Sequence, residues 1–444
     1  MAHLVLALDR GLTLADTRQE LRLARLTGAF PRGEDLPLNP SARALAQDAL
    51  RQGDKVWLVA GDGVMARAVL DRAGLSDGGV IELRDGDGAG AALAALRGRI
   101  GPGSFAYLGH DPSDRPLWQA AGSGWIVDGD PQALIRAGGP STIALPGRDA
   151  TGARALWQAL RSHHWIKNLL VFLPFLAAHR WTDLSAYAGS LLAFAVFCLT
   201  SSAIYLANDL FDLADDRRRP QKRHRPLAAG QLGVDTALSA IGGLLALALA
   251  LAWGLAATPS LALVTLVYAF AALAYSHWLK TLRFVDLAWL GGLYGLRVIA
   301  GGAAAGIALS GWLVVLCLFL FTALACIKRA AELVEARRTG GNGISRRGYR
   351  PGDLAAVTIL GAMAALGAGL VLVAYAFDVA AARLYARPWL LVLASGWIML
   401  WVLRLWRKVS AEGFGGDPIL FALRDRASWV LALCLALTLA CAVG

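Results

Sequence analysis

The sequence predicts a multi-pass α-helical membrane protein of about nine transmembrane helices, with a soluble α/β domain at its amino-terminal end. A mean hydropathy of +0.51 with 57% hydrophobic residues is too apolar for a soluble chain of 444 residues, while 17% charged residues is too high for a chain that lies entirely in lipid. Asp, Arg and Gly mix freely through the first 150 residues, and apolar runs separated by basic residues fill the rest. We therefore expect a soluble domain over residues 1–148 and a membrane domain over residues 149–444.

The apolar runs of the second part approach the roughly 20 residues needed to cross a bilayer. They lie near residues 155–180, 186–208, 233–255, 260–277, 286–305, 309–332, 354–376, 388–406 and 427–444. Lys and Arg collect after every second run, which is the pattern of cytoplasmic loops. The amino terminus, MAHLVLALDRG, lacks the features of a signal peptide. We expect a bacterial inner-membrane protein whose soluble domain and active site face the cytoplasm and whose carboxyl terminus lies outside.

The soluble part contains four candidate buried strands, HLVLALD, VWLVAG, VIEL and FAYLG, which alternate with helical stretches as in parallel βαβ units. The stretches LVLALDRGLTLADT and FAYLGHDPSDRPLW resemble the haloacid-dehalogenase phosphatase superfamily. The resemblance places Ala7 at the position of that family's nucleophilic Asp and Gly61 at that of a Ser or Thr, keeps Asp9, and finds no counterpart of its Lys. Asp111 and Asp114 could still bind a metal. Without a nucleophile no aspartyl phosphate forms, so we expect an inactive, structural or regulatory domain.

An Asp-rich motif, NDxxDxxxD, follows the second apolar run and consists of Asn208, Asp209, Asp212 and Asp216. On a helix, spacings of three and four place these carboxylates on one face. Three like charges repel, so the pattern indicates a divalent cation, and carboxylates with diphosphate oxygens are the ligands that Mg²⁺ prefers. The alternative is a solvated helix end. Ionisable groups at the end of a membrane helix are costly and usually functional, which favours a site.

Residues 155–444 resemble the UbiA superfamily of membrane-embedded transferases. The segment LRSHHWIKNLLVFLP resembles the family's opening segment, and AYSHWLKTLRFVDL occupies the place of a second Asp cluster but carries Tyr275, Ser276 and Lys280, with Asp286 as its only acid. The best match, through NDLFDLADDRRRPQKRHRPLAAG, YSHWLK, KRAAELVEARR, RRGY and DPILFALRDR, is to bacterial polyprenyl-phosphate phosphoribosyltransferases. The resemblance implies a magnesium-dependent transfer of 5-phosphoribose from phosphoribosyl diphosphate to a polyprenyl phosphate in the membrane.

Both substrates are strongly anionic, so cations and polar groups within the motif segments are candidate binding residues. With Lys280 as a catalytic cation, the expected substrate-binding residues are Lys167, Asn168, Lys222, Arg225, Tyr275, Arg297, Lys328, Arg329, Glu332 and Tyr349. Arg297 lies deep in an apolar run, where a bare guanidinium is costly, so it faces a cavity or pairs with an acid. The five cysteines lie in apolar runs without paired spacing, which predicts neither disulfides nor a thiolate metal site.

Two alternatives stay open. The first is prenyl transfer from a prenyl diphosphate to an aromatic acceptor through the same Asp-rich motif. The second is a non-enzymatic lipid-binding scaffold. No feature points to a nucleic acid partner, and the sequence does not decide whether the chain forms a homo-oligomer.

Overall fold

The structure of the protein is a computed structural model that describes residues 2–28, 30–84, 87–111, 114–136, 138–147, 152–256, 259–338, 348–411 and 418–443. The chain divides into two compact units. One comprises Met1–Ser162 and Tyr205–Gly243, and the other comprises His163–Ile204 and Leu244–Gly444. The Asp-rich motif therefore belongs to the same unit as the amino-terminal domain. The predicted boundary at residue 148 lies outside the described residues.

The first unit contains a six-stranded parallel sheet with the strand order β3-β2-β1-β4-β5-β6. Its strands are β1 His3–Ala7, β2 Lys55–Ala60, β3 Gly79–Glu82, β4 Phe105–Gly109, β5 Ser123–Val127 and β6 Thr142–Leu145. The four predicted strands are confirmed. β5 and β6 were not predicted, because SGWIV and TIAL are short and lack a continuous apolar run.

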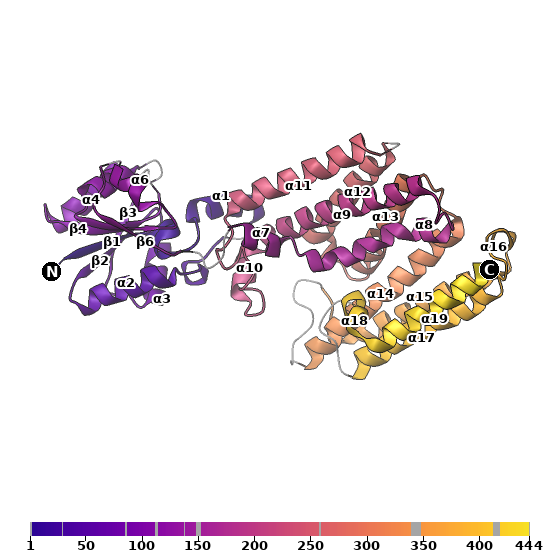
Figure 1. Ribbon diagram of the computed structural model, residues 1–444. Helices are drawn as coiled ribbons and strands as arrows, with labels where there is room; N and C mark the ends of the chain where they lie inside the picture. Colours follow the sequence, from indigo (N-terminus) through magenta and orange to yellow (C-terminus); the bar gives the residue numbers. More distant parts are fainter. Residues whose placement is uncertain are drawn as a thin grey trace. The chain divides into compact units, whose positions relative to one another are not determined.

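Helices cover both faces of this sheet. They are α2 Pro40–Arg51, α3 Gly63–Ala73, α4 Ala89–Ile100, α5 Arg115–Ala120 and α6 Pro131–Arg136, and α1 Thr17–Thr27 lies apart from these faces (Figure 1). α2 and α3 lie on one side of the sheet, and α4 and α6 lie on the other (Figure 1). Along β1, Leu4 and Leu6 belong to one apolar core and Val5 to the other, as the two-residue period of a strand requires.

Eight helices in the described part of the chain are long and apolar enough to cross a membrane. They are α9 Leu184–Phe211, α11 Val234–Gly254, α12 Ser260–His277, α13 Val285–Ala305, α14 Gly311–Arg338, α15 Leu354–Ala376, α17 Leu390–Ala411 and α19 Arg426–Val443. They agree with eight of the nine predicted spans, and the protein is a multi-pass integral membrane protein.

The first predicted span, residues 155–180, is not one continuous helix. It consists of α7 Gly152–Ala159, a 3-10 segment η4 Ser162–Phe172 and the short α8 Leu173–Ala177. Arg161 has a positive φ of 52°, and Pro174 lies in the first turn of α8, so the regular helical ladder is interrupted at both places. Irregular backbone at membrane depth is tolerated where it is buried in protein. The helix α13 covers η4 closely, because a Cβ at Gly301 would lie 1.8 Å from the carbonyl oxygen of Val171.

Candidate active site

The Asp-rich motif lies where α9 ends and the six-residue helix α10 Leu213–Arg218 begins. The amide of Asp212 donates to the carbonyl of Asn208 at 2.9 Å, and the amide of Asp216 donates to that of Asp212 at 2.8 Å. These bonds preserve the four-residue spacing across the junction. Asp209 and Asp216 are buried, with exposures of 3% and 1%, and Asp212 is half-buried.

Two predicted cations contact these carboxylates. Nη1 of Arg225 donates to Oδ1 of Asp209 at 3.0 Å and also to Oδ2 of Asp216. Nζ of Lys222 lies 3.2 Å from Oδ1 of Asp216. The two carboxylates thus converge on a single guanidinium nitrogen, which offsets the repulsion between them.

A third cation, Arg161, was not predicted. Its Nη2 donates to Oδ1 of Asp209, and its guanidinium lies over the ring of Tyr205, 5.6 Å from the centroid. Arg161 lies two residues after the end of α7 and is the second residue of the segment LRSHHWIKNLLVFLP, so its membership in that segment is the signal that could have identified it. Three cations from two stretches of the chain therefore contact the anionic motif.

The arrangement of these carboxylates indicates how a divalent cation could be held. Within the described residues, no three carboxylate, imidazole or thiolate groups converge as a self-sufficient metal site. Mg²⁺ is commonly bound by one or two carboxylates together with substrate phosphates, so the convergence of Asp209 and Asp216 fits such an ion. Oδ1 of Asn208, the first residue of the motif, is buried without a hydrogen-bond partner among the described residues, which leaves one more neutral oxygen there.

In the second unit, Arg297 and Asn168 form a buried polar cluster. Arg297 donates from Nε to Oδ1 of Asn168 at 2.9 Å, from Nη2 to the hydroxyl of Tyr268 at 2.7 Å and from Nη1 to the carbonyl of Leu293 at 2.7 Å. Its guanidinium also lies 4.8 Å from the centroid of the Tyr268 ring. No carboxylate is among its partners in the described part of the chain. The guanidinium is therefore satisfied by neutral groups and a cation–π contact, which answers the question that the sequence left open.

Arg329, Glu332 and Tyr349 gather around Asp286. Arg329 is fully buried and donates to Oδ2 of Asp286 and to Oε2 of Glu332, and Tyr349 donates to Oδ1 of Asp286. The amide of Phe284 donates to the Tyr349 hydroxyl at 2.8 Å. Burial, followed by the hydrogen bond to Asp286, raises the pKa of Tyr349. Both oxygens of Asp286, the only acid of the second motif segment, are thus engaged within the protein.

Four predicted residues of the second unit remain, and each lies on a different element. Lys280 lies on the 3-10 turn η5 Leu279–Thr281, Tyr275 lies near the end of α12, and Lys328 lies in α14. All three are half-buried, whereas Lys167 of η4 is buried.

In the amino-terminal domain, the residues that resemble a phosphatase site have other partners. Oδ1 of Asp9 accepts from the amide and the hydroxyl of Thr17, at 2.8 and 2.5 Å. Oδ2 of Asp114 accepts from the hydroxyl of Tyr107 at 2.7 Å. Burial raises the pKa of Asp9 and of Asp114.

The raised pKa of Asp9 predicts how the stability of the protein depends on pH. Because its folded-state pKa is raised, the buried carboxyl favours the folded state at low pH, and this contribution is lost as the pH rises through that pKa. Asp9→Asn keeps an acceptor for Thr17 and removes the charge. We expect the variant to gain thermal stability relative to the wild type at pH 7 and not at pH 4, as measured by thermal unfolding in detergent. Asp48→Asn, at an exposed pair with Arg51, is the control that should change little at either pH.

The same variant tests the assignment of the domain as inactive. With Ala7 in place of a nucleophile, the chain should release no phosphate from a ribose 5-phosphate ester above background. Turnover that disappears in Asp9→Asn would show that the domain is a working phosphatase.

Comparison with known families places the chain among membrane-embedded transferases. The chain belongs to the UbiA prenyltransferase family, whose profile matches residues 169–413. An uncharacterised protein of Sinorhizobium fredii is 34% identical over 345 residues, which are 76% of this chain and 65% of that protein. That alignment is longer than the membrane part alone, so it extends into the amino-terminal domain.

A second relative is named for its activity. The decaprenyl-phosphate phosphoribosyltransferase of Mycobacterium tuberculosis is 36% identical over 293 residues, which are 65% of this chain and 93% of that enzyme. Among solved structures, a UbiA homologue from Archaeoglobus fulgidus bound to GPP and Mg²⁺ is 18% identical, with a TM-score of 0.48 over 65% of this chain and 99% of that one.

Proposed function

We propose that the protein transfers a 5-phosphoribosyl group from phosphoribosyl diphosphate to a polyprenyl phosphate, with Mg²⁺, and releases diphosphate. The observation that carries the proposal is the 36% identity to a decaprenyl-phosphate phosphoribosyltransferase over 93% of that enzyme's length. The site contributes a second argument. Asp286 is bound on both oxygens by Arg329 and Tyr349, so the second segment offers no free carboxylate for a second metal ion and instead presents Lys280.

In the proposed reaction, the bond from ribose C1 to the diphosphate oxygen breaks and the diphosphate leaves with the electron pair. A phosphate oxygen of the lipid forms the new bond to C1, and no proton transfer is needed because that phosphate is ionised near neutral pH. Asp209, Asp212 and Asp216 would hold Mg²⁺, whose chemistry is to neutralise charge on the leaving group. Arg161, Lys222 and Arg225, which now contact these carboxylates, would neutralise further diphosphate oxygens.

We further propose that the amino-terminal domain is an inactive relative of the haloacid-dehalogenase fold over residues 1–148, and that it and the Asp-rich motif face the cytoplasm of a bacterial inner membrane. The remaining cations, Lys167, Lys328 and Arg297, would contribute to binding the lipid phosphate or the 5-phosphate.

The test is direct transfer. Purified protein in detergent with Mg²⁺, labelled phosphoribosyl diphosphate and undecaprenyl phosphate should yield a labelled lipid, and omission of Mg²⁺ or of the lipid should abolish it. Prenyl transfer to 4-hydroxybenzoate, with no label entering lipid, would replace this proposal with the aromatic prenyltransferase. If the protein binds lipid without Mg²⁺ and catalyses neither transfer, the result would favour the non-enzymatic lipid-binding scaffold.

A further inference from the structure

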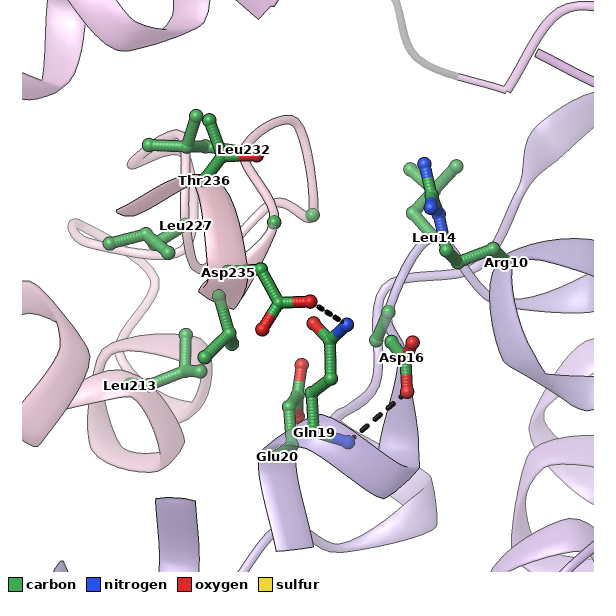
Figure 2. Close-up of a pocket in the computed structure, with 14 residues that line it drawn as sticks. Arg10, Leu14, Asp16, Gln19, Glu20, Leu213, Leu227, Leu232, Asp235 and Thr236 are labelled. Carbon is green, nitrogen blue, oxygen red and sulfur yellow. Dashed lines mark hydrogen bonds between the residues drawn. The ribbon is translucent and has the colours of Figure 1, made fainter. Parts of the chain in front are cut away.

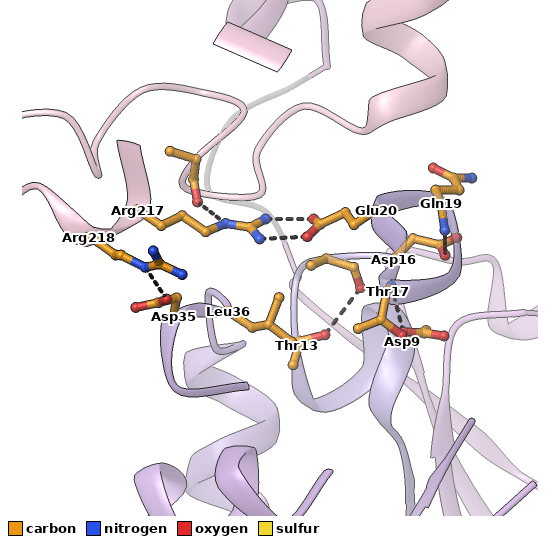
Figure 3. Close-up of polar contacts among 12 residues, drawn as sticks. Asp9, Thr13, Asp16, Thr17, Gln19, Glu20, Asp35, Leu36, Arg217 and Arg218 are labelled. Carbon is orange, nitrogen blue, oxygen red and sulfur yellow. Dashed lines mark hydrogen bonds and ion pairs between the residues drawn. The ribbon is translucent and has the colours of Figure 1, made fainter. Parts of the chain in front are cut away.

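The helix α10, which carries Asp216, is bound by α1 of the amino-terminal domain. Nη1 and Nη2 of Arg217 donate to the two carboxylate oxygens of Glu20, each at 2.6 Å (Figure 3). The Arg217 and Glu20 side chains are only 3% and 5% exposed. A bidentate, charge-assisted ion pair of this kind fixes the orientation of the two side chains as well as the distance between them. In the sequence, Arg217 is one of the basic residues that follow the second apolar run and carries no other signal.

Arg217 also connects two segments of the site. Its Nε donates to the carbonyl of Ala228 at 3.2 Å, and Ala228 lies three residues after Arg225. On the other side, Arg217 directly follows Asp216 in α10. One guanidinium therefore ties the helix that carries Asp216 to the turn that follows Arg225, and all three of its nitrogens are engaged once Glu20 is in place.

Apolar and backbone contacts continue this interface. Leu23 of α1 packs against the cluster that contains Leu213 and Leu227. Gly230 has φ +74°, and a Cβ there would lie 2.7 Å from the Cβ of Leu14, so its backbone approaches the domain closely. Within the first unit, the domain and residues 213–236 thus pack as one body.

Polar contacts at the edge of the interface are weaker. Nε of Arg218 donates to Oδ2 of Asp35 at 2.8 Å, with the Arg218 side chain 37% exposed (Figure 3). Gln19 donates to Asp235 beside a cavity of about 70 Å³ between α1 and the start of α11 (Figure 2). Exposed pairs of this kind contribute little, which makes Asp35 a suitable control for Glu20.

We propose that Glu20 is a positioning residue for diphosphate binding: the amino-terminal domain acts as a clamp that holds Asp216 and Arg225 in register through Arg217. The inference rests on the proposed function only in that the Asp-rich motif binds a diphosphate. A phosphoribosyl or a prenyl diphosphate would serve equally. It gives a domain without a phosphatase nucleophile a role in the membrane-embedded reaction.

The test compares Glu20→Gln with Asp35→Asn in the full chain. Loss of the Glu20 charge should raise the KM for the diphosphate donor about tenfold, leave the KM for the lipid phosphate unchanged and change kcat little. Amide hydrogen exchange in residues 213–230 should rise in Glu20→Gln, and Asp35→Asn should match the wild type in both measurements. Glu20→Asp, which keeps the charge, should raise the donor KM less than Glu20→Gln does.

A second measurement needs no variant. Because coupling is reciprocal, magnesium with inorganic diphosphate should slow exchange in α1 of the wild type as well as in residues 213–230. Protection confined to residues 213–230, or a donor KM for Glu20→Gln equal to that of the wild type, would overturn the clamp. If phosphoribosyl transfer itself fails, the same KM comparison with a prenyl diphosphate and the exchange experiment still decide this inference.

Discussion

Asp209→Ala should abolish transfer, with a loss of about a thousandfold in kcat/KM. The Asp209 carboxylate is 3% exposed and accepts from both Arg161 and Arg225, so alanine removes one of the two converging ligands for a cation and leaves two guanidinium groups without their counter-charge. The diphosphate would then meet an altered arrangement of cations without a correctly held metal. The measurement is transfer of labelled phosphoribose to lipid over a range of Mg²⁺ concentrations, with thermal unfolding in detergent to show that the variant is folded.

Asp215 provides a matched control. It lies in α10 beside Asp216, is half-buried, and lies one residue off the face that carries the other carboxylates, 3.9 Å from Arg218. Asp215→Asn should retain most of the activity, whereas Asp212→Ala should behave like Asp209→Ala. Normal turnover in both Asp209→Ala and Asp212→Ala would remove the Asp-rich motif from the mechanism.

Spacing and motif membership identify the Asp-rich motif, Lys222 and Arg225 as neighbouring groups, but they do not identify Arg161 or Glu20. On a helix the spacing places Asp209, Asp212 and Asp216 on one face. In the structure Asp212 departs from helical backbone angles, but the backbone bonds across the α9–α10 junction keep the four-residue spacing, and Asp209 and Asp216 converge on Arg225. The cation Arg161 is 48 residues from Asp209, and Glu20 is 197 residues from Arg217. Such pairings depend on tertiary packing, and loop arginines also serve the positive-inside pattern, so sequence alone could not separate the two roles.

Hydropathy predicted the membrane helices well and the first segment poorly. A sliding count of apolar residues does not register a backbone break, and residues 155–180 contain enough apolar side chains to resemble one span. The positive φ of Arg161 and the position of Pro174 divide this segment, and the buried Lys167 and Asn168 face protein rather than lipid. Polar residues inside an apolar run were thus the available signal for irregular structure.

Asp286, in the segment AYSHWLKTLRFVDL, is a second case in which sequence alone could not show what a side chain contacts. Sequence comparison identified it as the remaining acid where an Asp cluster was expected, but it could not show whether that acid was available. In the structure, Arg329 and Tyr349 donate hydrogen bonds to the two oxygens of Asp286. Removing one partner of a buried ion pair is strongly destabilising, so these residues are poor choices for testing catalysis by substitution. Lys280 is half-buried on a short turn and is a better choice.

Lys280→Ala is therefore expected to separate the pentose and prenyl functions. If Lys280 binds a substrate phosphate in place of a second metal cluster, its loss should weaken use of phosphoribosyl diphosphate or of the lipid phosphate by about 1.5–3 kcal/mol, the range for a charge-assisted hydrogen bond. This corresponds to a decrease in kcat/KM of roughly 10- to 150-fold. Lys280→Arg should restore little, because a planar guanidinium and a compact ammonium fit different phosphate geometries.

Arg337→Ala and Arg338→Ala are the controls, because both side chains are exposed at the end of α14 and belong to the basic residues that collect after every second apolar run. Their kcat/KM values should stay close to that of the wild type. The measurement is kcat/KM for each substrate in turn, with the other saturating, so that the affected phosphate is identified. Near-normal kinetics for Lys280→Ala, together with prenyl transfer to 4-hydroxybenzoate by the wild type, would contradict the phosphoribosyl assignment. They would leave the Asp-rich motif serving a prenyl diphosphate, because that motif recognises the diphosphate common to both donors and Lys280 is the residue expected to distinguish them.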